Sequence, residues 1–383
     1  MTNPIIANDP NKLIWLRLKQ LTSVQVCQNL MLEKYNKQGL AGDDLIVEKK
    51  AVGLSSAIEA ALGYWDETPR SLNSWVLSRY YALLQFTIAE QVSSPKNNSD
   101  LASVQKHTEQ GHGLAIWLKD IENPLDYRIY ALKSGHFYSY AKHLGCNPKK
   151  WAAEKRARKM SDLDQYETVT IGELFSCIAE LEPVLFSFIQ KPSRCLHIGH
   201  STENYRHKER LREQQRQEGN FSFDIPKSGS TFVDVYSNPE NPIDIELVRS
   251  TGIPLTEIGV KKNEDTAREI FTGELTHNPE NLWWSCIEHY KSDYTGSMYI
   301  EPLFGEVSDV IVRHFYLLYG LSILVRYMPD VWHEITTGKH DNVGALIEYY
   351  LTVFEGIIPT LMLERITGKE IRTAQPGSLN GLV

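Results

Sequence analysis

The stretch that decides the fold lies near the end of the chain, where residues 313–332 read Arg-His-Phe-Tyr-Leu-Leu-Tyr-Gly-Leu-Ser-Ile-Leu-Val-Arg-Tyr-Met-Pro-Asp-Val-Trp. Its longest apolar run covers residues 315–325, which is eleven residues, and ends at Arg326. A helix that crosses a membrane needs about 20 apolar residues. The run therefore predicts a helix buried inside a protein core, within a longer helix over 307–327.

Helical spacing of apolar residues recurs on both sides of this stretch. It predicts helices over residues 11–21, 23–36, 54–62, 71–92 and 342–367. In the segment 71–92 apolar residues occupy most faces, so this helix is expected at the centre of the fold. Thr68-Pro69 precedes it and is a helix-start signal. The chain is therefore predicted to be mostly helical.

The middle of the chain has a different pattern. An amphipathic helix is predicted over 171–189, and the very polar segment 205–217 predicts an exposed helix or a mobile loop. Apolar and polar residues then alternate, with Gly, Asn and Pro between the alternating segments. This pattern predicts strands over 221–225, 231–236 and 243–248, followed by a short helix over 263–272.

Together these patterns predict a mostly α protein of the α+β class, in which a helical bundle carries a small antiparallel β insertion. We expect three parts: an N-terminal helical part over residues 1–145, a basic and β-rich insertion over 146–262, and a C-terminal helical part over 263–383. With 383 residues, such a fold needs no disulfide or metal to stabilise its core.

Composition excludes several classes of protein. The chain is 42% hydrophobic and 10% aromatic, which is too apolar for a disordered protein. Its five cysteines are odd in number and contain no Cys-x-x-Cys pair, unlike those of a secreted protein. Residues 1–10 lack the basic and apolar segments of a signal peptide. We therefore expect a cytoplasmic protein that does not span a membrane.

The stretch 313–332 resembles the signature of the YaaC-like family of bacterial proteins, in which an aromatic-rich helix is followed by Leu-Ser, Arg-Tyr and a Trp. Residues 80–86 and the Gly111-His112-Gly113 turn correspond to the central helix and glycine-histidine loop of that family. Residues 345–361 match the helix and Ile-Pro turn that follow the signature. The family is similar to the HEPN superfamily, so the resemblance implies a HEPN-like helical bundle.

The HEPN resemblance also implies a candidate active site. Many HEPN domains are metal-independent ribonucleases that place an Arg and a nearby His against an RNA phosphodiester, often as two pairs in a dimer. The corresponding residues here are Arg326 and His333, with Glu334 able to orient the imidazole. Arg can bind a phosphate through two hydrogen bonds, and a near-neutral His can transfer a proton.

A structural role for Arg326 is the alternative interpretation. Active HEPN motifs usually have a polar residue after the Arg, whereas this chain has Tyr327. Pro329 lies between Arg326 and His333 and interrupts a helix. In this interpretation Arg326 neutralises the last carbonyls of a buried helix and packs under Trp332.

Charge is unevenly distributed although the net charge is only −8. Residues 147–160 contain six basic groups and one acidic group, residues 204–217 contain five and two, and residues 234–309 contain five basic and 15 acidic groups. Both basic segments are candidate nucleic-acid-binding surfaces, and solvated helix faces are the alternative. The candidate binding residues are Lys149, Lys150, Lys155, Arg156, Arg158, Lys159, Arg206, Arg210 and Arg212.

Motifs for cofactor or metal chemistry are weak. Cys195, His197 and His200 have the residue types of a zinc site but lack a second ligand cluster, so a turn with incidental histidines is favoured over a metal site. Ser55 and His112 have no nucleophile elbow to support them as a catalytic pair. The chain has neither a Gly-x-Gly-x-x-Gly motif nor a P-loop. We predict no metal and no cofactor.

The favoured hypothesis is a HEPN-related interaction or sensing module of a bacterial stress or defence system. The first alternative is a metal-independent ribonuclease that uses Arg326 and His333, and the second is a protein that binds a small molecule or nucleotide. The expected partner is RNA or a protein encoded nearby, and a homodimer fits the paired-site arrangement.

Overall fold

The computed structural model describes residues 2–40, 43–68, 70–97, 99–218, 229–237, 243–262, 268–300, 309–374 and 376. It divides the chain into two compact units. Unit 1 contains residues 1–174 and 304–383, and unit 2 contains residues 175–303. The chain therefore leaves the first unit after residue 174, forms the second, and returns to complete the first.

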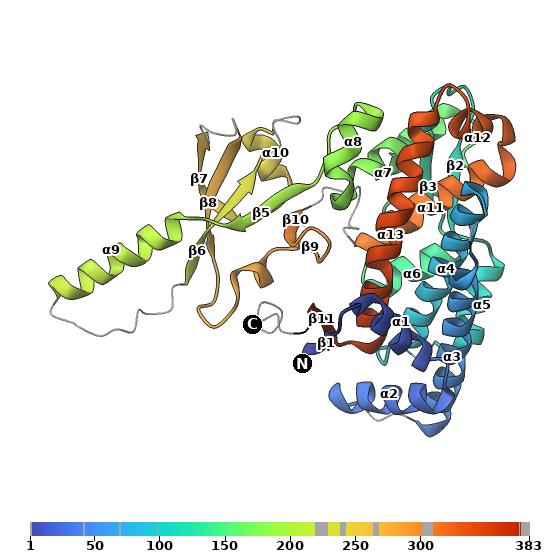
Figure 1. Cartoon of the computed structure of the whole chain (residues 1–383), viewed down its shortest axis with the longest axis horizontal. Helices are drawn as coiled ribbons and strands as arrows, with labels where there is room; N and C mark the ends of the chain where they lie inside the picture. Colours follow the sequence, from blue (N-terminus) through green and yellow to red (C-terminus); the bar gives the residue numbers. More distant parts are fainter. Residues whose placement is uncertain are drawn as a thin grey trace. The chain divides into compact units, whose positions relative to one another are not determined.

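Unit 1 is a helical bundle with small sheets (Figure 1). Its helices are α1 Pro10–Gln20, α2 Val24–Lys37, α3 Asp44–Asp66, α4 Leu72–Val92, α5 Leu101–Glu109, α6 His136–His143, α7 Ile171–Ser176, α11 Val310–Tyr327, α12 Pro329–Thr336 and α13 Asp341–Thr367. The helix α7 ends just beyond the boundary with unit 2. A mostly helical fold is thus confirmed.

The helix α4 lies at the centre of unit 1, as its apolar composition predicted. It packs against α3, α11 and α13, and its side chains are buried on almost every face. Ser71 begins it: the hydroxyl accepts a hydrogen bond from the Ser74 amide, and the Ser74 hydroxyl accepts one from the Ser71 amide. Tyr80 and Phe86 are completely buried and contribute large side chains to the core.

The helices α11 and α13 flank α4 from the C-terminal half of the chain. Both are long and apolar enough to cross a membrane, but 78% and 67% of their apolar windows are buried within the protein. That burial is the pattern of core helices in a soluble protein. The helix predicted over 342–367 is confirmed as α13, and Pro359, which the family resemblance assigned to a turn, lies inside it. Burial of the flanking Phe354 and Met362 keeps the helix continuous despite the proline.

Two small sheets complete unit 1. The strands β2 Leu114–Trp117, β3 Arg128–Ala131 and β4 Thr168–Thr170 form an antiparallel sheet in the order β2-β3-β4. The strands β1 Thr2–Ile6 and β11 Glu370–Ala374 pair in parallel. The first sheet ties residues 146–174 to the bundle, because Ala153 bridges to Leu132 and β4 pairs with β3.

The domain boundaries therefore differ from the expected ones at 145/146 and 262/263. Residues 146–174 contain the first basic segment and belong to unit 1 rather than to the β-rich insertion. The sequence did not reveal this because β2, β3 and β4 are only three or four residues long. Strands this short leave little periodicity to detect.

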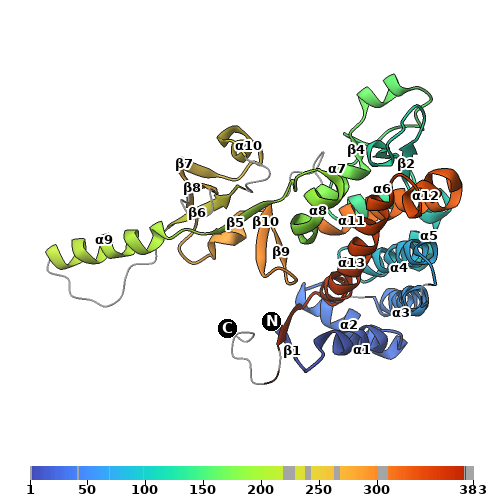
Figure 2. The same ribbon diagram turned by 45° about the horizontal axis from the view of Figure 1, so that its top comes forward.

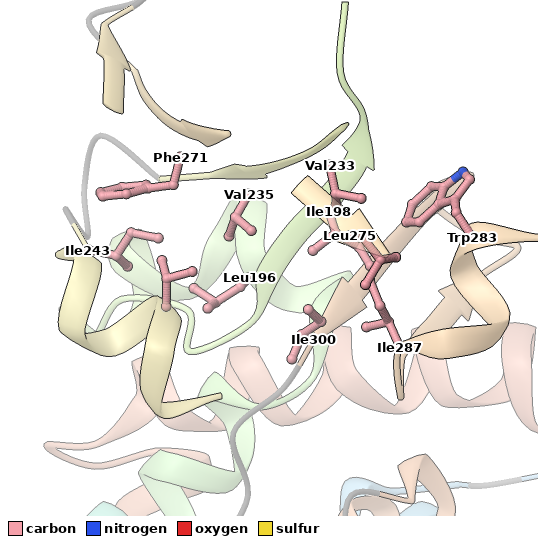
Figure 3. Packing of buried hydrophobic residues seen from close by; sticks show 11 residues of the cluster. Leu196, Ile198, Val233, Val235, Ile243, Phe271, Leu275, Trp283, Ile287 and Ile300 are labelled. Carbon is pink, nitrogen blue, oxygen red and sulfur yellow. The ribbon is translucent and has the colours of Figure 1, made fainter. Parts of the chain in front are cut away.

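Unit 2 is built on an antiparallel sheet of six strands, in the order β7-β8-β6-β5-β10-β9. They are β5 Leu196–His200, β6 Ser230–Tyr236, β7 Leu255–Lys262, β8 Glu269–Thr276, β9 Tyr290–Ser292 and β10 Ser297–Ile300. Buried residues such as Ile198, Val235 and Phe271 form its own apolar core (Figure 3). The expected antiparallel β insertion is thus present and larger than predicted.

Three predictions in this region, two of helices and one of a strand, need correction. The predicted helix over 171–189 is broken into α7, a 3-10 turn Ala179–Leu181 and α8 Glu182–Ile189, with Pro183 in the first turn of α8. The predicted strand 243–248 is instead the helix α10 Ile245–Ser250, because Asp244 caps its first turn by accepting a hydrogen bond from the Leu247 amide. Residues 269–272 lie in β8 rather than in a helix.

The polar segment 205–217 forms the helix α9 Glu203–Gln217, as one of the two alternatives predicted. Its first turn is anchored on β6, because the Asn204 side chain donates to the Phe232 carbonyl and accepts from the Phe232 amide. The rest of α9 extends away from the sheet (Figure 2). The predicted strand 221–225 lies outside the described residues.

Three glycines hold a loop of unit 1 against the start of α6. Gly111, Gly113 and Gly135 all have positive φ, and the His136 and Phe137 amides donate to the Gly111 and His112 carbonyls at 2.9 and 3.0 Å. A Cβ on Gly135 would lie 2.5 Å from the Gly113 nitrogen and 2.7 Å from the Gly111 oxygen. The backbones therefore approach too closely for any side chain at residue 135.

Replacing Gly135 with alanine should destabilise unit 1 strongly. Gly135→Ala combines the cost of positive φ with a backbone clash, so we expect the free energy of unfolding to fall by about 3 kcal/mol or more. Gly145 also has positive φ, but a Cβ there meets nothing within 4 Å. Gly145→Ala should therefore cost only about 1 kcal/mol. Equal losses for the two variants in denaturant unfolding would contradict the packing of this loop.

Candidate functional site

Arg326 lies in the last turn of α11 and is held in place by three hydrogen bonds. Its Nε donates to the Ser322 carbonyl at 3.0 Å, one terminal nitrogen donates to the Ser322 hydroxyl at 3.2 Å, and the other donates to the Tyr81 hydroxyl at 3.3 Å. A guanidinium has five N–H donors. Two N–H donors of Arg326 therefore remain for a ligand, and the side chain is only partly buried.

His333 lies on a different helix from Arg326. The helix α11 ends at Tyr327, and α12 begins at Pro329, so the proline starts a new helix between the two residues. His333 is exposed, and its Nδ1 is 3.1 Å from the Thr337 hydroxyl. Glu334 accepts from the Lys339 amide rather than orienting the imidazole. No interaction joins Arg326 to His333 among the contacts of the described residues.

A different imidazole lies close to Arg326, that of His112 in the Gly111-His112-Gly113 loop. Its ring centroid is 5.5 Å from that of Tyr80 on α4 and 6.1 Å from that of Tyr319 on α11. Burial lowers the pKa of His112, and the positive charge of Arg326 lowers it further. Its Nδ1 is buried without a hydrogen-bond partner. His112 is therefore an uncharged imidazole at neutral pH.

Two tyrosines contact the guanidinium of Arg326, the half-buried Tyr81 and the exposed Tyr327. Its central carbon lies 5.2 Å from the ring of Tyr327, which is 65% exposed. Tyr81 stacks on Tyr64 with ring centroids 5.4 Å apart. Aromatic faces beside an arginine can stack with nucleobases while the arginine binds a phosphate. We call this set the Arg326 cluster: Tyr64, Tyr80, Tyr81, His112, Tyr319, Arg326 and Tyr327.

The first basic segment lies next to the Arg326 cluster. Burial raises the pKa of Tyr319 to about 12, and the positive charges of Arg156 and Arg326 both oppose that rise. The charges of Arg156 in the basic segment and of Arg326 in the cluster thus both act on Tyr319. The segment is anchored on β3, because the Ala157 amide donates to the Tyr130 hydroxyl at 2.8 Å. We call residues 149–159 the basic loop.

The basic loop presents its charges to solvent. Six basic side chains are exposed: Lys149, Lys150, Lys155, Arg156, Arg158 and Lys159. The Arg158 and Lys159 amides donate to the Asp162 carboxylate at 2.8 and 3.2 Å, which fixes the backbone without neutralising the side chains. Glu154 pairs with Lys133, which lies outside the loop, at 2.6 Å. A positive surface thus adjoins the Arg326 cluster within unit 1.

The second basic segment belongs to unit 2. Arg206, Arg210 and Arg212 are exposed on α9. Arg206 pairs with Glu203 at 2.9 Å, and Lys261 of β7 pairs with the same carboxylate. A helix that is polar on all faces is typical of a surface that contacts a partner or solvent. The two candidate nucleic-acid-binding segments therefore lie on separate units.

The zinc candidate does not assemble. Cys195 directly precedes β5, and His197 and His200 lie within it, so the expected turn is a strand. Positions 197 and 200 point to opposite faces of the sheet. His197 packs against Tyr236 with ring centroids 4.9 Å apart. No group of three metal-binding side chains occurs among the described residues.

Sequence reasoning missed the residues that join Arg326 in the cluster. Tyr81 and His112 lie far from it along the chain, and His112 had been considered only as a base for a serine nucleophile. Both residues lie in segments that resemble the YaaC-like family, as does the stretch 313–332 that contains Arg326. That shared resemblance was the signal in the sequence that could have linked them. Trp332 was predicted to cover Arg326, but its indole donates to the Asn73 side chain of α4 at 2.6 Å.

The proximity of Arg326 and His112 can be tested by titration. In Arg326→Gln the positive charge is lost, so the pKa of His112 should rise toward 6.5 while burial still holds it below that value. NMR titration of the histidine Cε1 protons would measure this change. Lys37→Gln removes an exposed charge at the end of α2 and should leave the His112 pKa unchanged. An equal shift in both variants would contradict the proximity.

Comparison with known proteins supports the family resemblance. Residues 19–366 match the family model described as YaaC-like Protein. No curated protein and no solved structure matches the chain significantly. The matched region contains the Arg326 cluster and the basic loop, together with all of unit 2. The chain therefore belongs to the YaaC-like family.

Proposed function

We propose that this protein is an RNA-binding sensing module with a HEPN-like helical bundle. The observation that supports it is the position of the Arg326 cluster beside the basic loop on one unit. Single-stranded nucleic acid is bound by positive surfaces that follow the backbone and by aromatic rings that stack with bases. In this proposal the basic loop contacts phosphates, Arg326 binds one phosphate with its two remaining donors, and Tyr327 stacks with a base.

Single-stranded RNA should bind through this surface in a salt-dependent manner. We expect Arg326→Gln/Tyr327→Ala to weaken binding about tenfold, because a stacked base contributes about 1–3 kcal/mol. Neutralising Lys155, Arg156 and Arg158 to Gln should weaken binding and also reduce the slope of log affinity against log salt, by about 0.7 for each lost phosphate contact. Fluorescence anisotropy with labelled RNA at 50 to 200 mM salt would measure both effects.

Lys37→Gln is the matched control, since it removes one exposed charge outside this surface. It should leave both the affinity and the salt slope unchanged. RNA binding that is equal in the wild type and in the variants of the cluster and loop would refute the proposed surface. Retained thermal unfolding transitions would establish that the variants fold.

A second candidate function is metal-independent RNA cleavage by Arg326 with His112. The specific observation that favours it is the uncharged imidazole of His112 next to the guanidinium. Such an imidazole can accept the proton of a ribose 2′-OH. The 2′ oxygen then attacks phosphorus, the bond to the 5′ oxygen breaks, and a 2′,3′-cyclic phosphate forms. The leaving 5′ oxygen takes a proton from an acid, and Arg326 stabilises the phosphate charge.

Cleavage assays in excess chelator separate these two functions and the two histidines. The nuclease hypothesis predicts cleavage that His112→Ala abolishes and His333→Ala leaves intact. The pair first suggested by the sequence, Arg326 with His333, predicts the reverse. The sensing module predicts RNA binding without cleavage in the wild type, and products with 2′,3′-cyclic ends would overturn that part of the proposal.

We also propose a cytoplasmic location and a protein partner encoded nearby, with a homodimer as one arrangement. The support is the charge on unit 2, where the exposed arginines of α9 offer a contact surface that the Arg326 cluster does not use. Co-purification with the products of neighbouring genes tests the partner. Its loss on changing Arg206, Arg210 and Arg212 to Glu would assign the contact to α9.

A further inference from the structure

A cationic cavity lies at the C-terminal end of α4. It has a volume of about 470 Å³ and is lined by residues of α2, α4, α6 and α13 and by the loop after α4. Its charged and titratable lining residues are Lys34, Glu90, Lys96, Lys142, His143 and Arg365. Tyr81 and Glu90 are nine residues apart on α4, which separates the Arg326 cluster from this cavity by about 13 Å along the helix axis.

The acidic group of the cavity is already neutralised. Glu90 accepts a hydrogen bond from the Tyr140 hydroxyl at 2.7 Å and lies 3.5 Å from the Arg365 guanidinium. Arg365 in turn donates to both oxygens of Asp309 at 2.8 and 2.9 Å. Burial raises the pKa of Glu90. These four side chains form a closed network with little net charge.

Within the described part of the chain, the three lysines of the cavity have no acidic partner within 4 Å. The ammonium of Lys34 donates to the Ile366 carbonyl and to the Ser93 hydroxyl at 2.7 and 3.2 Å, which are neutral acceptors. Lys142 lies over the ring of Tyr138 at 4.4 Å. Lys96 is exposed, and its side chain has no hydrogen bond or ion pair with a described residue. Four basic side chains thus line the cavity against the single carboxylate of Glu90.

The pKa of His143 reflects the positive potential inside the cavity. Burial, together with the positive charges of Lys34, Arg365, Lys50 and Lys96, lowers its pKa to about 4. Its Nε2 lies 3.9 Å from Glu90, and the attraction of that carboxylate does not offset these effects. An anion bound among these groups would gain strong electrostatic stabilisation, since part of the site is removed from bulk water.

A second, polar cavity adjoins the first. Its volume is about 390 Å³, and the two cavities share Asn97, Lys142 and His143. Most of its other lining residues carry amides or hydroxyls, namely Gln91, Ser99, Gln110, Ser134, Tyr138 and Ser139, and His107 and Lys133 also line it. Amides and hydroxyls of this kind can hydrogen-bond a ribose and a base. Cavities that bind small molecules usually have volumes of about 300–1,000 Å³.

We propose that these joined cavities bind a nucleotide with two or three phosphates, the phosphates among Lys34, Lys96 and Lys142 and the nucleoside in the polar cavity. The three unpaired ammonium groups match the charge of a polyphosphate better than that of a single carboxylate. This site goes beyond the RNA surface proposed above and shares no residue with it. A sensing module with two sites would thus bind RNA near the middle of α4 and a small nucleotide at its C-terminal end.

Binding of ATP, GTP, CTP and UTP, each tested separately without divalent metal at about 50 mM salt, tests the site. We expect at least one of them to bind the full-length protein in calorimetry and to raise its melting temperature. Lys96→Gln/Lys142→Gln should weaken that binding at least tenfold. Both side chains are exposed, so the fold should be retained. Lys12→Gln/Lys19→Gln removes two exposed charges of α1 that do not line the cavity and should leave the affinity unchanged.

Binding of inorganic triphosphate tests the cationic cavity alone, and binding of the free nucleoside tests the polar cavity alone. The proposal predicts that the nucleotide binds more tightly than either. Equal affinity for triphosphate and nucleotide would overturn the assignment of the polar cavity. The absence of nucleotide binding, or equal affinities in the wild type and Lys96→Gln/Lys142→Gln, would overturn the whole site. Arg326→Gln should leave nucleotide binding intact, so failure here is distinguishable from failure of the RNA surface.

Discussion

The structure of unit 1 depends on the burial of α4. A helix that is enclosed on almost every face must satisfy each polar side chain it carries, because an unpaired buried polar group costs about 1–3 kcal/mol. Several partners of α4 come from the C-terminal third of the chain. Glu355 accepts from Trp75 and Arg79, each at 2.6 Å, and Asn73 accepts from Trp332.

These partners also account for the family signature in physical terms. Two residues of the signature, Arg326 and Trp332, donate hydrogen bonds to α4 at Tyr81 and Asn73 respectively. They lie on either side of the break between α11 and α12, so together they fix that junction on the central helix. Arg326 is thus joined to α4 through Tyr81, and two of its donors remain for a ligand.

The sequence predicted the long elements well and the short ones poorly. The buried helices α4, α11 and α13 contain many apolar residues at helical spacing, so their existence and approximate ends were predictable. In 243–248 the alternation suggested a strand, while a single Asp244 cap stabilises a helix there. For the candidate site, the sequence could relate residues to each other only when they lie in one continuous segment. The three-glycine loop positions His112 in the Arg326 cluster. No pattern in the sequence indicates that two such distant segments lie close together.

The division of unit 1 between two distant parts of the chain bears on how the protein folds during synthesis. Arg79 and Glu355 are 276 residues apart, so α4 emerges from the ribosome long before the helices that cover it. Unit 2 has its own core and lies between them in sequence. Domains usually fold as units in the order of their synthesis. Unit 2 would then fold while the apolar surface of α4 is still uncovered, because α11 and α13 have not yet been synthesised. The chain is most prone to aggregation during that interval.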